Sequence, residues 1–288
     1  MTVEEFNNMP HDEAAKQLSN YCGATKWQQE MLQNMPFKNV NELIKTMQQI
    51  WYKQCGENDW LEAFTHHPKI GDVKSLTEKF ATTKHLAGNE QKNVNDASVE
   101  TINNLAKANT EYEEKFGFIF IVCATGKTAE EMLRLLTDRL QNNKTAEINI
   151  AMGEQNKITF LRLKNLFPNE NWSSIKPCQL TTHVLNTSVG KPGKNISIRL
   201  QKMNENIWET FAQGVTNDDG RVGDLLPPGF ILDAAKYKLI FETAAYFNMQ
   251  DVQSFYPAVE IQFNIFDEAH YHVPLLINPF GYSTYRGS

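Results

Sequence analysis

The sequence contains few cysteines, and their spacing fits neither a metal-binding motif nor a disulfide framework. Cys22, Cys55, Cys123 and Cys178 are scattered along 288 residues, and no Cys-x-x-Cys pair occurs. A dense cysteine pattern would be needed for a disulfide scaffold. We therefore expect reduced thiols with a structural role.

A surplus of positive charge and long apolar runs are also missing. The net charge of -6 and the pI near 5.7 argue against nucleic acid or an anionic membrane as partner. No stretch approaches the roughly 20 apolar residues of a membrane span, and residues 1–12 do not resemble a signal peptide. The final Arg286-Gly287-Ser288 is no peroxisomal address. We expect a cytoplasmic protein that acts on small molecules.

Two hydrophobic patterns divide the chain. Before residue 165 apolar residues recur every three or four positions, and after residue 181 they alternate, which predicts helices and then strands. Pro168 and Pro177, with Asn, Ser and Glu between them, are typical of a linker. We predict a helical domain over 1–166, a linker over 167–177 and a β domain over 178–288.

The spacing of apolar residues in the first half predicts an all-helical, bundle-like fold. We expect helices over 4–21 with a break at Pro10, and over 26–32, 40–52, 60–64, 96–116, 128–140 and 147–166. Trp27, Trp51 and Trp60 are interpreted as core residues. The apolar run 118–124 is expected to be extended but outside any sheet, so its backbone groups need partners. A bound substrate could supply them.

Two features of this half are candidates for a catalytic or ligand-binding site. His66 and His67 stand where Pro68 must end a helix, which suits either an acid/base group or a helix-capping histidine. Arg162 falls within the apolar stripe of its helix, so it needs a carboxylate or an anionic ligand. Glu90 is a candidate for a purely structural pair.

Several separated motifs then resemble one family. His67-Pro68-Lys69-Ile70-Gly71-Asp72, Glu90-Gln91, Tyr112-Glu113-x-x-Phe116-Gly117-Phe118 and Arg162 resemble 2-oxo-4-hydroxy-4-carboxy-5-ureidoimidazoline (OHCU) decarboxylase. The resemblance implies a cofactor-free decarboxylase with His67 as the catalytic acid/base or polarising group. It assigns substrate binding to Pro68, Ala87, Glu90, Gln91, Phe120, Ile121, Val122, Cys123, Ala124 and Arg162. Lys69 and Ala87 depart from the family, which usually has Arg and Ser there.

The second half alternates like half-buried strands. Strands are expected over 180–185, 196–200, 207–213, 237–242, 259–265 and 270–276, with a turn at 217–220 and one short helix over 243–249. Short strands at this spacing predict an antiparallel, immunoglobulin-like sandwich.

Three histidines of this half raise a metal-site hypothesis. His270 and His272 share a strand face, and with His183 they could hold zinc. No acid or thiol is placed to orient such a site, and Arg221 would repel a cation. We therefore favour a site without metal.

The C-terminal motif gives a better explanation of these histidines and of Arg221 than a metal site does. Tyr285-Arg286-Gly287-Ser288, together with 180–185 and 272–276, resembles 5-hydroxyisourate hydrolase of the transthyretin-related family, whereas hormone-carrying transthyretins lack that tetrapeptide. The resemblance implies a hydrolytic centre of His183, Arg221 and His272, with Tyr285 and Ser288 shaping the pocket. It also implies a tetramer through this half. Asn186 replaces a common Asp.

The two resemblances together imply a fused enzyme of urate breakdown. The β half would open 5-hydroxyisourate to OHCU, and the helical half would decarboxylate OHCU to (S)-allantoin without a cofactor. The expected partners are these small molecules and further copies of the chain, with dimer contacts possible through the helical half. The alternative is a transthyretin-like binding module that carries an inactive helical domain.

Overall fold

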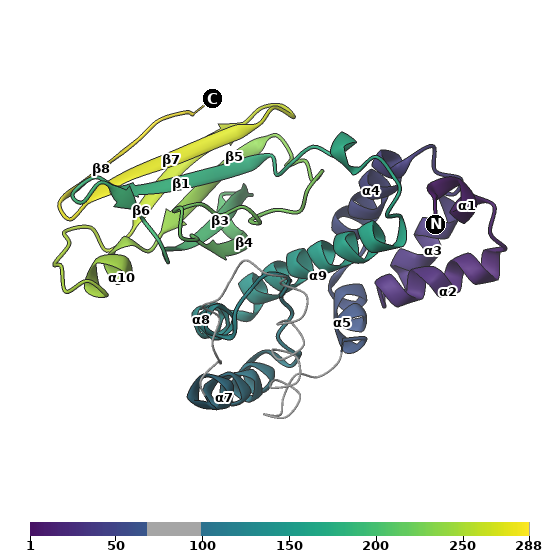
Figure 1. Cartoon of the computed structure of the whole chain (residues 1–288), viewed down its shortest axis with the longest axis horizontal. Helices are drawn as coiled ribbons and strands as arrows, with labels where there is room; N and C mark the ends of the chain where they lie inside the picture. The colour runs from purple at the N-terminus through teal and green to yellow at the C-terminus, as the bar shows by residue number, and fades with distance from the viewer. Residues whose placement is uncertain (68–98, 288) are drawn as a thin grey trace.

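The computed structural model describes residues 1–67 and 99–287 (Figure 1). Its first half is helical, and its second half is a sandwich of two sheets beside the helices. The predicted fold class of both halves is thereby confirmed. The domain limits at 166 and 178 stay a prediction, although α9 ends at Leu166 and the first strand begins at Leu180.

The helices match the predicted spans to within a few residues. They are α1 (Val3–Asn7), α2 (His11–Tyr21), α3 (Thr25–Gln33), α4 (Val40–Gln49), the π-helical turn η1 (Ile50–Gln54), α5 (Glu57–Thr65), α7 (Val99–Phe116), α8 (Ala129–Arg139) and α9 (Lys144–Leu166). α9 starts three residues before its predicted start because Asn143 caps it, accepting from the amide of Ala146 at 2.8 Å. This polar first turn carries no apolar stripe.

In the helical half, the capping box, the core tryptophans and the cysteines lie as the sequence predicts. Thr128 and Glu131 form the capping box that opens α8. Trp27 and Trp51 are buried, and Trp60 packs against the same core. The four cysteines are free and buried, and burial raises the pKa of the Cys22 thiol to about 12. The predicted reduced thiols are therefore confirmed, since each of the four cysteines is buried and none forms a disulfide.

The second half contains more strands than the alternation predicts. They are β1 (Leu180–Asn186), β2 (Lys191–Pro192), β3 (Ser197–Asn204), β4 (Ile207–Val215), β5 (Ala235–Phe241), β6 (Val259–Ile265), β7 (Tyr271–Asn278) and β8 (Gly281–Thr284), with helix α10 (Thr243–Asn248) after β5. The sheets have the orders β2-β1-β7-β8 and β4-β3-β5-β6. One pair, β1 with β7, is parallel, so a purely antiparallel sandwich is wrong on this point.

The two halves contact each other through α9 and the π-helical turn. α9 packs against β4, where Asn149 donates to the carbonyl of Thr210 at 3.2 Å. Tyr52 of η1 lies against Phe211 and Phe230 of the β half, with ring centroids 5.9 and 4.3 Å away. Along the described ranges, no helix has both the length and the apolar character of a membrane crossing.

A buried ion pair joins α8 to α9. Arg139 Nη2 lies 2.5 Å from Glu147 Oε1, and neither side chain is more than 3% exposed. Tyr112 also donates to this carboxylate, and Asn142 donates to its second oxygen at 2.8 Å. A buried charge pair is tolerated only when its remaining polar atoms are satisfied, and these two neighbours satisfy the carboxylate.

We predict that Glu147→Gln lowers the free energy of unfolding by about 3–5 kcal/mol, because it leaves the guanidinium of Arg139 buried without its counter-charge. Denaturant titration followed by circular dichroism measures this. Glu111→Gln is the control, since Glu111 pairs with Lys107 at the surface and such a pair contributes about 0.5 kcal/mol or less. Equal losses in the two variants would contradict the prediction.

Candidate active sites

His67 follows α5 and is held by α9. Its Nε2 lies 2.5 Å from Oε1 of Gln155. The amide nitrogen of Gln155 donates to Thr159 Oγ1 at 3.2 Å, which fixes the orientation of the amide. The oxygen therefore faces the imidazole, so a neutral His67 carries its proton on Nε2.

Arg162 belongs to the same stripe of α9. Gln155, Thr159 and Arg162 follow one another at spacings of four and three residues, so they lie on one helix face. The guanidinium is half-buried and donates to the carbonyl of Tyr21 at 3.1 Å. Burial lowers its pKa, and within the described part of the chain no carboxylate pairs with it. The predicted inward orientation fits this position.

The segment 118–124 is extended and belongs to neither sheet. Its backbone groups are nevertheless partly satisfied by the protein. The amide of Cys123 donates to Glu154 at 2.7 Å, and the carbonyl of Ile121 accepts from Arg139 at 2.7 Å. The carbonyl of Ala124 accepts from the amide of Lys127 at 3.1 Å. These three groups therefore have partners within the protein, and binding of a substrate by this segment stays a prediction.

Five candidate residues lie outside the described residues. They are Pro68, Ala87, Glu90, Gln91 and Ser288. The same holds for the proposed pairing of Arg162 with Glu90. The described part of the helical site therefore consists of His67, Arg162 and the segment 118–124.

The β half brings His183 and His272 to one face. In the parallel pair of β1 and β7, Thr181 lies opposite His272 and His183 lies opposite Pro274. Paired residues of adjacent strands point to the same side, and every second residue of a strand does so too. Both histidines therefore lie on the outer face of this sheet. Thr181 Oγ1 contacts Nδ1 of His272 and Nε2 of His270, both at 2.9 Å.

Arg221 completes the predicted set. It follows the 217–220 turn and pairs with His183 as an isolated antiparallel bridge. Partial burial, and next the positive charge of Arg221, lower the pKa of His183. The same two causes lower the pKa of His272. Both imidazoles are therefore held neutral to lower pH than a free histidine.

The zinc hypothesis finds no geometric support. The rings of His270 and His272 stack 6.5 Å apart, with Thr181 hydrogen-bonded to both. In the part of the chain that the structure describes, no three His, Cys, Asp or Glu side chains are grouped to hold a metal ion.

The C-terminal tail lies over His272. Gly287 forms a bridge with His272, donating its amide to the histidine carbonyl at 2.9 Å. A Cβ added at Gly287 would stand 2.4 Å from Cδ2 of His272, so only glycine fits this approach. Tyr285 remains 59% exposed. The tail is thus held against the site through the bridge at Gly287.

Sequence reasoning missed three supporting residues, Gln155, Thr159 and Thr181. Gln155 precedes Thr159 by four residues, and Thr159 precedes Arg162 by three. This helical spacing could be recognised in the sequence. Thr181 alternates with His183 on β1 and so shares its face. Its contact with His272 depends on the strand register, which the sequence does not give.

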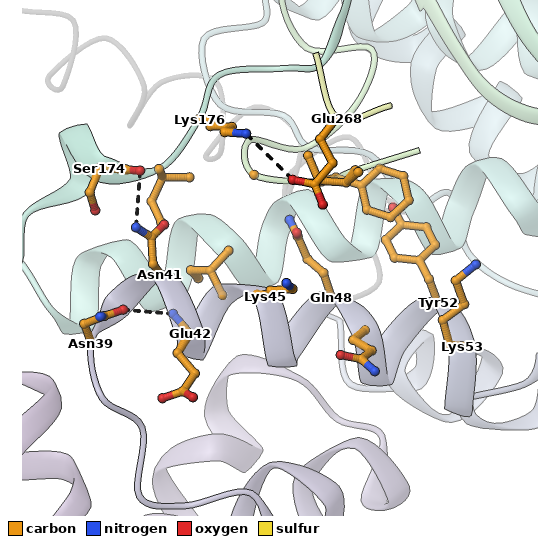
Figure 2. A pocket seen from close by; sticks show the side chains of 16 residues that line it. Asn39, Asn41, Glu42, Lys45, Gln48, Tyr52, Lys53, Ser174, Lys176 and Glu268 are labelled. Atoms are coloured by element: carbon orange, nitrogen blue, oxygen red, sulfur yellow. Dashed lines mark hydrogen bonds and ion pairs between the residues drawn. The ribbon is translucent and has the colours of Figure 1, made fainter. Parts of the chain in front are cut away.

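A separate groove of about 670 Å³ lies between α4, the linker and residues 229–231. Figure 2 shows Lys176 facing Glu268, 3.8 Å apart, and Asn41 donating to the carbonyl of Ser174 at 3.3 Å. None of the predicted site residues lines this groove.

Comparisons with known proteins cover both halves. A model described as OHCU decarboxylase matches residues 7–164, and one described as HIUase/Transthyretin family matches residues 180–287. The uric acid degradation bifunctional protein TTL of Arabidopsis thaliana is 32% identical over 93% of this chain and 96% of its own length. The 5-hydroxyisourate hydrolase of Mus musculus is 43% identical over 38% of this chain and 94% of its own length.

Among solved structures, a crystal structure of (S)-allantoin synthase aligns with 100% of both chains at 25% identity and a TM-score of 0.44. The chain belongs to the OHCU decarboxylase family through its helical half and to the HIUase/Transthyretin family through its β half.

Proposed function

We propose that this chain catalyses two consecutive steps of urate breakdown. The β half hydrolyses 5-hydroxyisourate to OHCU, and the helical half decarboxylates OHCU to (S)-allantoin. The observation that carries the proposal is the likeness to the bifunctional uric acid degradation protein, which extends over 93% of the chain and so includes both halves.

In the hydrolytic step, His183 and His272 act as general bases. A neutral imidazole takes a proton from the water that attacks the ring carbonyl, and the lowered pKa values of the two histidines keep that form available. The guanidinium of Arg221 stabilises the oxyanion that develops on the carbonyl. The ring C–N bond then breaks as the imidazolium returns this proton to the departing nitrogen, which leaves a carboxylate on the former carbonyl carbon. Tyr285 and Ser288 border the substrate in this proposal.

In the decarboxylation step, His67 acts as the acid/base group on one face of the OHCU ring. Loss of carbon dioxide leaves a carbanion-like centre that needs charge dispersal and a proton from one side. The hydrogen bond that His67 donates to Gln155 holds its imidazole in one orientation, which would give a single stereochemical product. Arg162 anchors the ring, with Pro68, Ala87, Glu90, Gln91 and the backbone at Phe120 and Val122 as further contacts.

We also propose a homo-oligomer assembled through the β half, as a dimer of dimers. β6 and β8 are the outer strands of their sheets, and open edges pair readily with another copy. An exposed aromatic cluster accompanies β8, in which Tyr256 contacts Phe255 and Tyr282 with centroids 5.0 and 5.3 Å apart. A second copy would cover this cluster and the exposed Tyr285.

Single substitutions should separate the two activities. With fresh 5-hydroxyisourate made by urate oxidase, His183→Gln should slow the first absorbance decay by about 10²-fold. His67→Asn should leave that decay intact and abolish the circular dichroism signal of (S)-allantoin. If both variants match the unmodified protein in both readouts, the site assignments are wrong. Binding of substrate without turnover by the unmodified protein would instead favour a binding module.

Removing the charge of Arg221 should change the pH dependence of hydrolysis. Partial burial, and next this cation, lower the pKa of both histidines, so the rate of the unmodified protein should fall only at a pH below the ordinary pKa of histidine, as the imidazoles gain protons. In Arg221→Gln the pKa values rise, and the acid limb of the residual rate should move to higher pH. Arg199→Gln is the control, because Arg199, on β3, already pairs with Glu242. An unmoved acid limb in Arg221→Gln would refute this electrostatic coupling.

Gly287→Ala should displace the tail from the hydrolytic site. Because the new Cβ would collide with the ring of His272, we expect hydrolysis to drop on the order of 10²-fold, while decarboxylation of supplied OHCU is retained. Gly223→Ala is the matched control, since a Cβ added at Gly223 would meet no atom within 4 Å. A fully active Gly287→Ala variant would show that the tail does not position His272.

A further inference from the structure

A cavity of about 370 Å³ lies between the two halves. Residues 122–127, α8 and α9 line it from the helical half, and the end of β4 with the loop to Asp224 lines it from the β half. Val122 belongs to the segment proposed to bind OHCU, and Arg221 belongs to the proposed hydrolytic centre. The same cavity is therefore bordered by a residue of each proposed site.

The cavity wall carries five basic and three acidic side chains, a surplus of two positive charges. Three of the basic groups have a carboxylate partner. These pairs are Lys127 with Asp224 at 2.7 Å, Lys157 with Glu154 at 2.5 Å, and Arg139 with Glu147 at 2.5 Å. Arg134 and Arg221 are the two basic side chains of the wall that remain, and Glu131 is its remaining acid, since Glu147 does not line the cavity.

Arg134 and Arg221 form no ion pair with any residue that the structure describes. Arg134, on α8, donates to the carbonyl of Asn195 across the interface, and burial lowers its pKa. Asp138 and Glu131 act on the guanidinium of Arg134 only from beyond ion-pair distance. A half-buried guanidinium that no carboxylate contacts directly is costly to desolvate, and its planar donor fork matches a carboxylate in two-point geometry. These arginines come from opposite halves and line one cavity.

The chemistry of the proposed steps supplies such a ligand. Ring opening creates a carboxylate beside Arg221, and decarboxylation consumes the same group in the helical half. The volume lies within the range of small-molecule pockets. Resting on the proposed function, we propose that this cavity binds the carboxylate of OHCU through Arg134 and Arg221 and retains the product between the two sites.

The test compares the full chain with a mixture of two variants, His67→Asn and His183→Gln, each with one intact site. Starting from 5-hydroxyisourate, retention predicts a shorter lag before (S)-allantoin appears, and a higher enantiomeric excess, in the unmodified chain than in the mixture. Arg134→Gln should lengthen the lag roughly tenfold, the loss expected for one charge-assisted contact, and lower the excess toward that of the mixture. Arg134→Lys, which restores the charge, should recover much of the effect.

Two controls separate retention from other causes. Lys53→Gln breaks another ion pair between the halves, with Asp233 at 2.6 Å, and does not line this cavity, so its lag should be unchanged. Hydrolysis of 5-hydroxyisourate and decarboxylation of supplied OHCU, measured separately, should be normal in Arg134→Gln. A lag in the unmodified chain equal to that of the mixture, or unaffected by Arg134→Gln, overturns the inference. Absence of either separate activity in the unmodified chain refutes the proposed function instead.

Discussion

The structure depends on the burial of α9 on more than one side. This helix lies in the helical core through residues such as Ile148 and Leu163, and it also packs against β4. The charged side chains that this helix buries cannot reach water, so they need partners inside the protein. Glu147 pairs with Arg139, and Glu154 pairs with Lys157. The internal ion pairs are thus a consequence of placing one helix between two cores.

The same burial links the candidate sites to the interface. One face of α9 holds the imidazole of His67 through Gln155. Glu154, the next residue, accepts from the amide of Cys123 in the extended segment and from Lys157. Asp224 of the β half pairs with Lys127, close to that segment. A change in the packing of the β half would therefore act on the segment 118–124 through a short series of ionic contacts.

The sequence was sufficient to predict most of the fold, because periodicity and capping act over a few residues. Arg162 and His67 were found in this way, as was the β1 alternation that exposes His183. Contacts between distant residues were not predictable, since Gln155 meets His67 across 88 positions and Thr181 meets His272 only in a parallel register. The short strand β8 was missed because its residues are exposed and show no alternating burial.

The position of α9 also limits how copies of the chain can associate. A sheet has two edges, and an unpaired edge tends to recruit another strand. At β4 this edge is covered by the helix of the same chain, to which Asn149 adds a hydrogen bond with Thr210. The outer strands β2, β6 and β8 remain. The assembly proposed through β6 and β8 would therefore use edges other than the one that α9 covers, so every copy could carry a helical half without competing for that surface.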